Sequence, residues 1–255
     1  LVDQQRAVTT VDQLVDEAIA EPVDVERAPP REVLQRFAPL RIAPKAAGAP
    51  RNRFAFFGQL NPFKGIKVLI DAVTRVPADV WGDAVLYVHG GNLEHQPEEF
   101  QAGVKELFRL AGRRIRFMGS YKSPELPNLM REVDWVIVPS TWWENAPVVI
   151  QESFHHGRPI LASDIGGMAE KVRDGIDGLH FHVGNPESLA EQMTRAIREP
   201  ALWDRLRAGI RPPTSAEESA RLHARLFERL LERREGRGAP GAVQAGTGRA
   251  GAGAT

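Results

Sequence analysis

Short apolar runs alternate with longer amphipathic segments through most of this sequence, and this alternation is the feature that most constrains its fold. From Arg53 onward the runs read "FAFFG", "AVLYVHG", "IRFMG", "WVIVPS" and "PILAS", and segments of helical period such as residues 66–76 and 98–110 lie between them. Runs that are apolar on both faces are typical of strands buried between two helical layers, so the pattern predicts a parallel α/β sheet flanked by helices. Ligands of such sheets bind outside the carboxyl ends of the strands. We therefore expect Gly58, Gly119, Ser140 and Gly166 to line one edge.

Changes in composition along the chain predict four regions. Residues 1–50 are rich in Ala, Pro and charged residues and are expected to form a linker or a weakly structured segment, with one short helix at residues 11–20. Residues 51–210 are expected to form a Rossmann-like domain. Residues 211–235 hold a Leu- and Arg-rich amphipathic helix, predicted over residues 216–234, and residues 236–255 are a low-complexity tail expected to be disordered.

The overall composition excludes several classes of protein. Because 33 Lys and Arg balance 33 Asp and Glu, the chain lacks the basic field that favours nucleic acid, and no nucleic-acid partner is expected. With 0 Cys, disulfides, thiolate metal sites and cysteine nucleophiles are excluded. No apolar run reaches the roughly 18 residues of a membrane span. We expect a cytoplasmic protein, or one peripheral at the inner membrane, and the start at Leu1 suggests a piece of a longer chain.

The stretch "WWENAPVVIQE" carries two carboxylates, Glu144 and Glu152, on either side of a predicted helix start. Pro147 lies near the first helical position and Gly157 suits the helix end, so the helix start is predicted near residues 145–147. A helix start presents unpaired N–H groups and a partial positive charge, which suits a phosphate. At about 1.5 Å rise per residue, the two carboxylates are on the order of 10 Å apart and bracket a phosphate-sized gap. This arrangement fits a nucleoside diphosphate sugar, whereas a retaining glycosidase pair stands about 5 to 5.5 Å apart. Two exposed acids that merely flank a helix are the alternative.

A second candidate anion site lies in "FFGQLNPFKGIKVLIDAV", where a strand ends at Gly58 and a helix begins after Gly65. Lys64 adds a point charge at that turn, and the glycines let the backbone approach a phosphate, although this spacing is not a Walker A motif. The Gly166–Gly167 pair follows another strand and either admits a ligand or simply turns the chain.

The histidines and tryptophans favour structural roles over metal or nucleic-acid binding. His180 and His182 alternate along a predicted strand and so share one face, which is half of a metal site, but no third ligand is evident and no metal is expected. Trp142 and Trp143 are expected to pack at the rim of the pocket or against a further domain.

Taken in order, these motifs resemble the C-terminal, donor-binding half of family 4 retaining glycosyltransferases of the GT-B fold, over about residues 52–232. The family's motif of two Glu separated by seven residues is matched by Glu144 and Glu152, after a strand that ends in Pro139–Ser140. The family's glycine-rich turn is matched by Gly58, Lys64 and Gly65. Gln59 replaces the Arg that usually shares the neutralisation of the diphosphate with the lysine.

The resemblance implies transfer of a sugar from a nucleotide-sugar donor to a hydroxyl of a glycan, lipid or small molecule, with retention of configuration and without metal or other cofactor. Lys64 and the helix N–H groups would hold the diphosphate, Glu152 the ribose and Glu144 the sugar, and the base would rest near residues 119–121. It thereby assigns catalysis to Glu144 and Lys64, and donor binding to Gly58, Gln59, Lys64, Gly119, Tyr121, Ser140, Asn145, Ala146, Pro147, Val148 and Glu152.

A GT-B enzyme has two such domains, and this sequence predicts only one. Three hypotheses remain open: a catalytic half whose N-terminal acceptor-binding domain lies upstream of Leu1, a stand-alone nucleotide-sugar-binding module without turnover, and a GT-B sugar-nucleotide epimerase. The spaced glutamates favour the first, because they are not the signature of the epimerase family.

Overall fold

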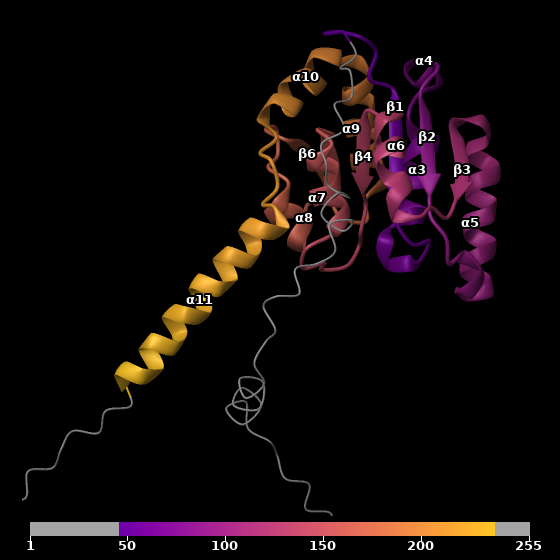
Figure 1. Cartoon of the computed structure of the whole chain (residues 1–255). Coiled ribbons are helices and arrows are strands. Elements are labelled where there is room, and N and C mark those ends of the chain that lie inside the picture. Colours follow the sequence, from indigo (N-terminus) through magenta and orange to yellow (C-terminus); the bar gives the residue numbers. More distant parts are fainter. Residues whose placement is uncertain (1–45, 238–255) are drawn as a thin grey trace, which may run out of the picture. The chain divides into compact units, whose positions relative to one another are not determined.

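A computed structural model describes residues 46–237 and shows a six-stranded parallel sheet covered by helices on both faces (Figure 1). The predicted helix at residues 11–20 and most of the predicted tail lie outside the described residues. The strand order is β3-β2-β1-β4-β5-β6, which confirms the predicted parallel Rossmann-like sheet. The strands are β1 (Arg53–Phe57), β2 (Val85–His89), β3 (Ile115–Gly119), β4 (Trp135–Val138), β5 (Ile160–Ser163) and β6 (Gly178–Phe181).

Two apolar clusters lie against the two faces of the sheet, because alternate strand residues point to opposite sides. Phe54 and Phe56 of β1 join the cluster beneath α3, α4, α5, α9 and α10, whereas Ala55 and Phe57 join the cluster beneath α6, α7 and α8. The helices are α3 (Ile66–Arg75), α4 (Ala78–Trp81), α5 (Glu98–Ala111), α6 (Leu126–Arg131), α7 (Val148–His155), α8 (Gly166–Lys171), α9 (Pro186–Arg198), α10 (Pro200–Gly209) and α11 (Ala216–Arg237). Burial on both faces explains why the strand sequences are almost continuously apolar.

Element boundaries differ from the sequence-based expectations by one to three residues, as is usual at frayed ends. The helix expected at residues 66–76 ends at Arg75, and the one expected at residues 216–234 runs to Arg237. Among residues 46–237, no helix is long and apolar enough to cross a membrane.

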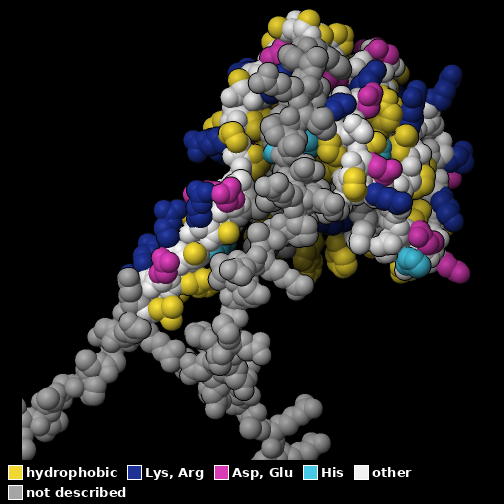
Figure 2. All heavy atoms as spheres, in the orientation of Figure 1, with side chains coloured by type: hydrophobic (Ala, Val, Ile, Leu, Met, Phe, Trp, Pro, Cys, Tyr) yellow, Lys and Arg dark blue, Asp and Glu magenta, His cyan; other side chains and the backbone are white. Residues whose placement is uncertain are grey.

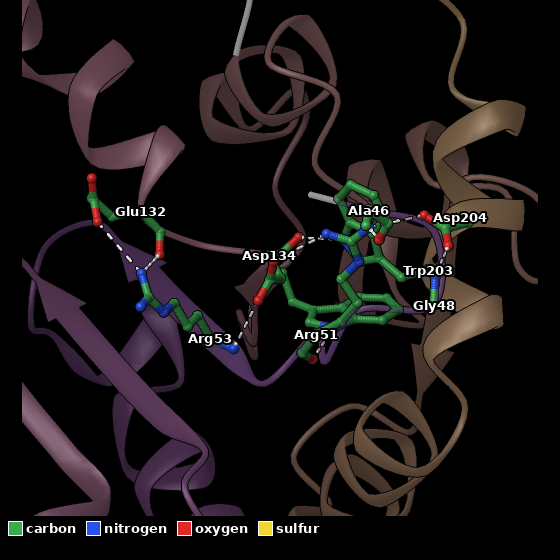
Figure 3. Close-up of polar contacts among 9 residues, drawn as sticks. Ala46, Gly48, Arg51, Arg53, Glu132, Asp134, Trp203 and Asp204 are labelled. Atoms are coloured by element: carbon green, nitrogen blue, oxygen red, sulfur yellow. Dashed lines mark hydrogen bonds and ion pairs between the residues drawn. The ribbon is translucent and has the colours of Figure 1, made fainter. Parts of the chain in front are cut away.

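A buried charge network fixes the amino-terminal edge of the sheet (Figure 3). Arg51 stacks on the ring of Trp203 at 3.9 Å and contacts Asp134 at 3.8 Å and Asp204 at 3.1 Å. The Trp135 indole donates a hydrogen bond to the Arg51 carbonyl at 2.9 Å. These contacts tie the segment before β1 to the start of β4 and to α10, at the edge opposite the candidate site.

Within the described residues, the apolar stripe of the amphipathic helix α11 is exposed. Leu222, Leu226 and Leu230 are 49%, 44% and 50% exposed. Figure 2 shows hydrophobic side chains in yellow along this helix, beside Arg and Glu. An exposed apolar stripe of this kind is typical of a surface that another protein segment covers.

Candidate functional site

The carboxyl ends of β1, β3, β4 and β5 lie along one edge of the parallel sheet and carry Gly58, Gly119, Ser140 and Gly166 respectively, as predicted. The chain runs outward from β1 through β2 to β3, and then crosses back to β4 on the other side of β1 and continues outward to β6, so the strand order reverses between β1 and β4. Open α/β sheets bind ligands at this switch point. The candidate site therefore lies where the loops after β1 and β4 meet.

The loop after β1 holds Lys64 at the end of a short 3₁₀ turn, η1 (Pro62–Lys64). The Asn61 side chain caps this turn by accepting a hydrogen bond from the Lys64 N–H at 2.9 Å, and Pro62 occupies the first position. Sequence reasoning missed the role of Asn61, although Asn-Pro three residues before Lys64 is a recognisable capping signal. The cap fixes the backbone from which the lysine extends.

Gly65 adopts a left-handed backbone conformation with φ of 70°, and a Cβ at this position would collide with the carbonyl oxygen of Pro139. Thr141 reinforces the contact by donating its N–H to the Phe63 carbonyl at 2.9 Å. Gly65 thus brings the two loops together, whereas the sequence suggested that it makes room for a phosphate. The close approach of the two backbones places Lys64 beside the β4 loop.

Replacement of Gly65 by alanine is expected to lower the free energy of unfolding by about 1 to 2 kcal/mol more than replacement of Gly184, because only Gly65 adds a backbone collision to the strain of a positive φ. Gly184 is the matched control, since its φ is 71° and a Cβ there would meet nothing within 4 Å. Urea denaturation of Gly65→Ala and Gly184→Ala measures the difference. Equal losses in the two variants would show that the loops can separate at little cost.

Glu144 faces Lys64 across the switch point. Its Oε2 lies 2.8 Å from the Lys64 Nζ, and its Oε1 accepts a hydrogen bond from the hydroxyl of Ser140. Ser140 is 1% exposed, and the side chains of Lys64 and Glu144 are 34% and 17% exposed. Three of the predicted site residues are thus brought into direct contact, although Glu144 is 80 positions from Lys64 in the sequence.

Helix α7 begins at Val148, and Pro147 is the residue before its first turn, with φ of −58° and ψ of 118°. The sequence predicted the helix start near residues 145–147, so the helix begins one residue later than expected. Asn145, Ala146 and Pro147 form the approach to this start, in the loop that follows Glu144. The first N–H groups of a helix lack carbonyl partners within it, so α7 offers donors to an anion at the edge of the sheet.

Glu152 lies on α7 near Tyr121 of the loop after β3. Burial raises the pKa of the Glu152 carboxyl. The pKa of the Tyr121 hydroxyl is raised to about 12, mainly by burial and to a smaller extent by the negative charge of Glu152. The Tyr121 ring packs edge-on against Phe57 at 5.6 Å and against His89 at 6.2 Å. Glu152 therefore lies near the loop after β3, which is where the resemblance places the base.

His89 is a residue of this region that sequence reasoning missed. It ends β2, is 5% exposed and stacks on Phe57 with ring centroids 4.8 Å apart. Burial lowers the pKa of its imidazole, which favours the neutral ring. The sequence feature that could have identified His89 is its position as the last residue of a predicted strand, immediately before Gly90–Gly91.

The Gly166–Gly167 pair begins α8 and packs against the loop that carries Glu144. The Gly167 N–H donates to the Glu144 carbonyl at 2.6 Å, and a Cβ on Gly167 would collide with the carbonyl oxygens of Glu144 and Asn145. Of the two readings that the sequence left open, this contact supports a backbone role. The pair holds the Glu144 backbone in place.

The tryptophans after Ser140 lie at the rim of the site. Trp142 and Trp143 are 59% and 70% exposed, and Trp142 packs edge-on against Phe63 with ring centroids 5.5 Å apart. Lys64 follows Phe63 directly, so this apolar rim adjoins the Lys64–Glu144 pair.

His180 in β6 and His182 immediately after that strand contact separate partners. His180 Nε2 lies 2.7 Å from the Val172 carbonyl oxygen, and His182 Nδ1 lies 2.9 Å from Asp164 Oδ2. Within the described part of the chain, no group of three or more His, Cys, Asp or Glu is placed to hold a metal ion.

Comparison with known proteins places the chain in a family. Residues 51–199, more than half of the chain, match the family described as glycosyl transferases group 1. The chain belongs to this family. The match covers the sheet with both candidate loops, and it confirms the resemblance based on Glu144, Glu152 and the turn at Lys64.

Two similar relatives are bacterial glycosyltransferases. The D-inositol 3-phosphate glycosyltransferase of a Nocardioides species is 31% identical over 225 residues, which are 82% of this chain and 47% of that protein. The phosphatidyl-myo-inositol mannosyltransferase of Mycobacterium leprae is 30% identical over 169 residues, which are 65% of this chain and 43% of that protein. The chain thus spans less than half the length of either relative.

Several solved structures share the fold of this chain. HepE of Anabaena, solved in complex with UDP-glucose, superposes with a TM-score of 0.60 at 22% identity, over 79% of this chain and 51% of that one. The C-terminal domain of a group 1 glycosyl transferase of Francisella tularensis has a TM-score of 0.55 at 20% identity, over 63% of this chain and 82% of that domain. The fold is therefore that of the C-terminal half of a GT-B glycosyltransferase.

Proposed function

We propose that this chain is the donor-binding half of a retaining glycosyltransferase that uses a nucleotide sugar. The observation that carries the proposal is the meeting of Lys64 and Glu144 at the switch point of the sheet, beside the start of α7. A cation and free helix N–H groups at one place suit a diphosphate. The Anabaena protein of the same fold, which was solved with UDP-glucose, supports the choice of a nucleotide sugar.

In the proposed reaction, the bond between the anomeric carbon and the diphosphate oxygen breaks, and its electron pair leaves with the diphosphate. The anomeric carbon then bonds to the acceptor oxygen, whose proton passes to the departing diphosphate or to water. Lys64 and the N–H groups at the start of α7 stabilise the negative charge that develops on the diphosphate. No metal is proposed in this step, because these groups supply the positive charge.

Each glutamate has a separate proposed role. Glu152 accepts hydrogen bonds from the ribose hydroxyls, and its position near Tyr121 supports a base beside the loop that follows Gly119. Glu144 contacts the transferred sugar from the other side of the diphosphate. Gly58 and Gln59 line the same edge, and the Gln59 amide donates where the family usually has an arginine.

Calorimetric titration with UDP, GDP and ADP tests the donor site without an acceptor. At least one nucleoside diphosphate should bind, and Lys64→Met should weaken its binding by about tenfold or more, since a hydrogen bond to a charged group contributes about 1.5 to 3 kcal/mol. Lys67→Met is the control, because the Lys67 ammonium group lies 4.8 Å from the ring of Phe100 in α5, and it should leave affinity unchanged. Loss of affinity in both variants alike, or binding of none of the three, would contradict the proposal.

A further inference from the structure

The lysine proposed to hold the diphosphate is paired within the protein itself. Its ammonium group lies 2.8 Å from Glu144 Oε2. A carboxylate and a phosphate present the same kind of oxygen acceptor to an ammonium group. The Glu144 carboxylate therefore takes up a donor of Lys64 that a diphosphate oxygen could otherwise use.

The backbone on each side of this pair is fixed. Asn61 caps the turn that carries Lys64, and Gly65 packs against Pro139 immediately before Ser140. On the other side, the Glu144 carbonyl accepts the Gly167 N–H at 2.6 Å. Separation of the two charges therefore requires rotation of a side chain, without movement of either loop.

The hydroxyl of Ser140 donates to the second oxygen of the same carboxylate. Since Ser140 is 1% exposed, its hydroxyl is directed by the surrounding structure. Ser140 thus acts as a positioning residue, which keeps the carboxylate turned toward the lysine.

We propose that Glu144 is an internal competitor for Lys64, which a bound diphosphate must displace and which helps to release the diphosphate product. The inference rests on the proposed donor site. In this role the Glu144 carboxylate weakens the binding of the diphosphate in the ground state. Its proposed contact with the sugar has the opposite effect, because it favours the transition state. The consequence is that removal of the carboxylate strengthens the binding of a bare diphosphate.

Inorganic pyrophosphate is the direct probe, because it has neither base nor sugar. In calorimetric titrations at low ionic strength, Glu144→Gln is expected to bind pyrophosphate roughly two- to fivefold more tightly than the unmodified chain, the range for a partly exposed ion pair. Glu132→Gln is the control for general charge, because Glu132 is exposed and pairs with Arg53 at the opposite edge of the sheet. This variant should leave pyrophosphate affinity unchanged.

The same titration in a Lys64→Met background separates competition from simple repulsion. If Glu144 acts by holding the lysine, most of the gain from Glu144→Gln should disappear once Lys64 is absent. An equal gain in both backgrounds, or weaker pyrophosphate binding by Glu144→Gln, would overturn the inference while leaving the donor site intact. Failure of every variant to bind pyrophosphate and nucleoside diphosphates would instead contradict the proposed function, and this inference with it.

Discussion

Replacement of Glu144 by glutamine should reduce the turnover number by about one to two orders of magnitude in an enzyme that combines this chain with an acceptor-binding domain. The carboxylate is proposed to contact the sugar, whose charge and shape change as the bond to the diphosphate breaks. An interaction that strengthens in the transition state affects turnover more than it affects substrate binding. One charge-assisted hydrogen bond of about 1.5 to 3 kcal/mol accounts for this magnitude.

The affinity of Glu144→Gln for nucleoside diphosphate should rise, because the substitution releases Lys64 from its ion pair. Steady-state kinetics and calorimetry on the same variant measure the two effects. Ser140→Ala is the companion variant, since it leaves the carboxylate charged but removes the hydroxyl that orients it. A Glu144→Gln enzyme that kept its turnover number while losing nucleotide affinity would show that the roles of the two glutamates are wrongly assigned.

Glu152→Gln is expected to weaken nucleoside diphosphate and intact donor by a similar factor, about one to two orders of magnitude. The ribose hydroxyls are the same in donor and product, so the contact provides uniform binding and should leave the turnover number largely unchanged. Titration with nucleoside diphosphate and with the donor nucleotide sugar gives the two factors. Unequal losses would place Glu152 at the sugar.

The stability of Glu152→Gln provides an independent check that the variant is folded. Because burial raises the folded-state pKa of Glu152, its contribution to stability is present below the unfolded-state pKa and is lost as pH rises through the folded-state pKa. Glutamine does not ionise, so the variant does not lose stability in this pH range. The variant should therefore gain unfolding free energy relative to the unmodified chain as pH rises through that range, even though it binds nucleotide more weakly.

The fold was predictable because it depends on local patterns. A strand such as β4, "WVIV", is buried at every position, and this reads directly from the sequence as a strand between two helical layers. The turn residues that follow the strands, such as Gly58 and Ser140, then place the site at the carboxyl edge. The spacing of Glu144 and Glu152 likewise follows from the start of one helix, although that start lies one residue beyond the expected position.

The pairings within the site were not predictable, because they join distant parts of the chain. Nothing in the sequence around Lys64 indicates that Glu144 is its partner. The pair depends on the packing of Gly65 against Pro139. The approach of Tyr121 to Glu152 similarly depends on the order of β3 and β4 in the sheet. Sequence patterns specify which elements form, whereas these contacts result from how the elements pack.

A crystal structure of this chain with the nucleoside diphosphate that binds most tightly tests the central claim most directly. We expect a diphosphate oxygen about 3 Å from Lys64 Nζ, in place of the Glu144 carboxylate, with another accepting N–H groups at the start of α7. The ribose should lie against Glu152. A diphosphate bound elsewhere on the domain, with the Lys64–Glu144 pair undisturbed, would contradict the account.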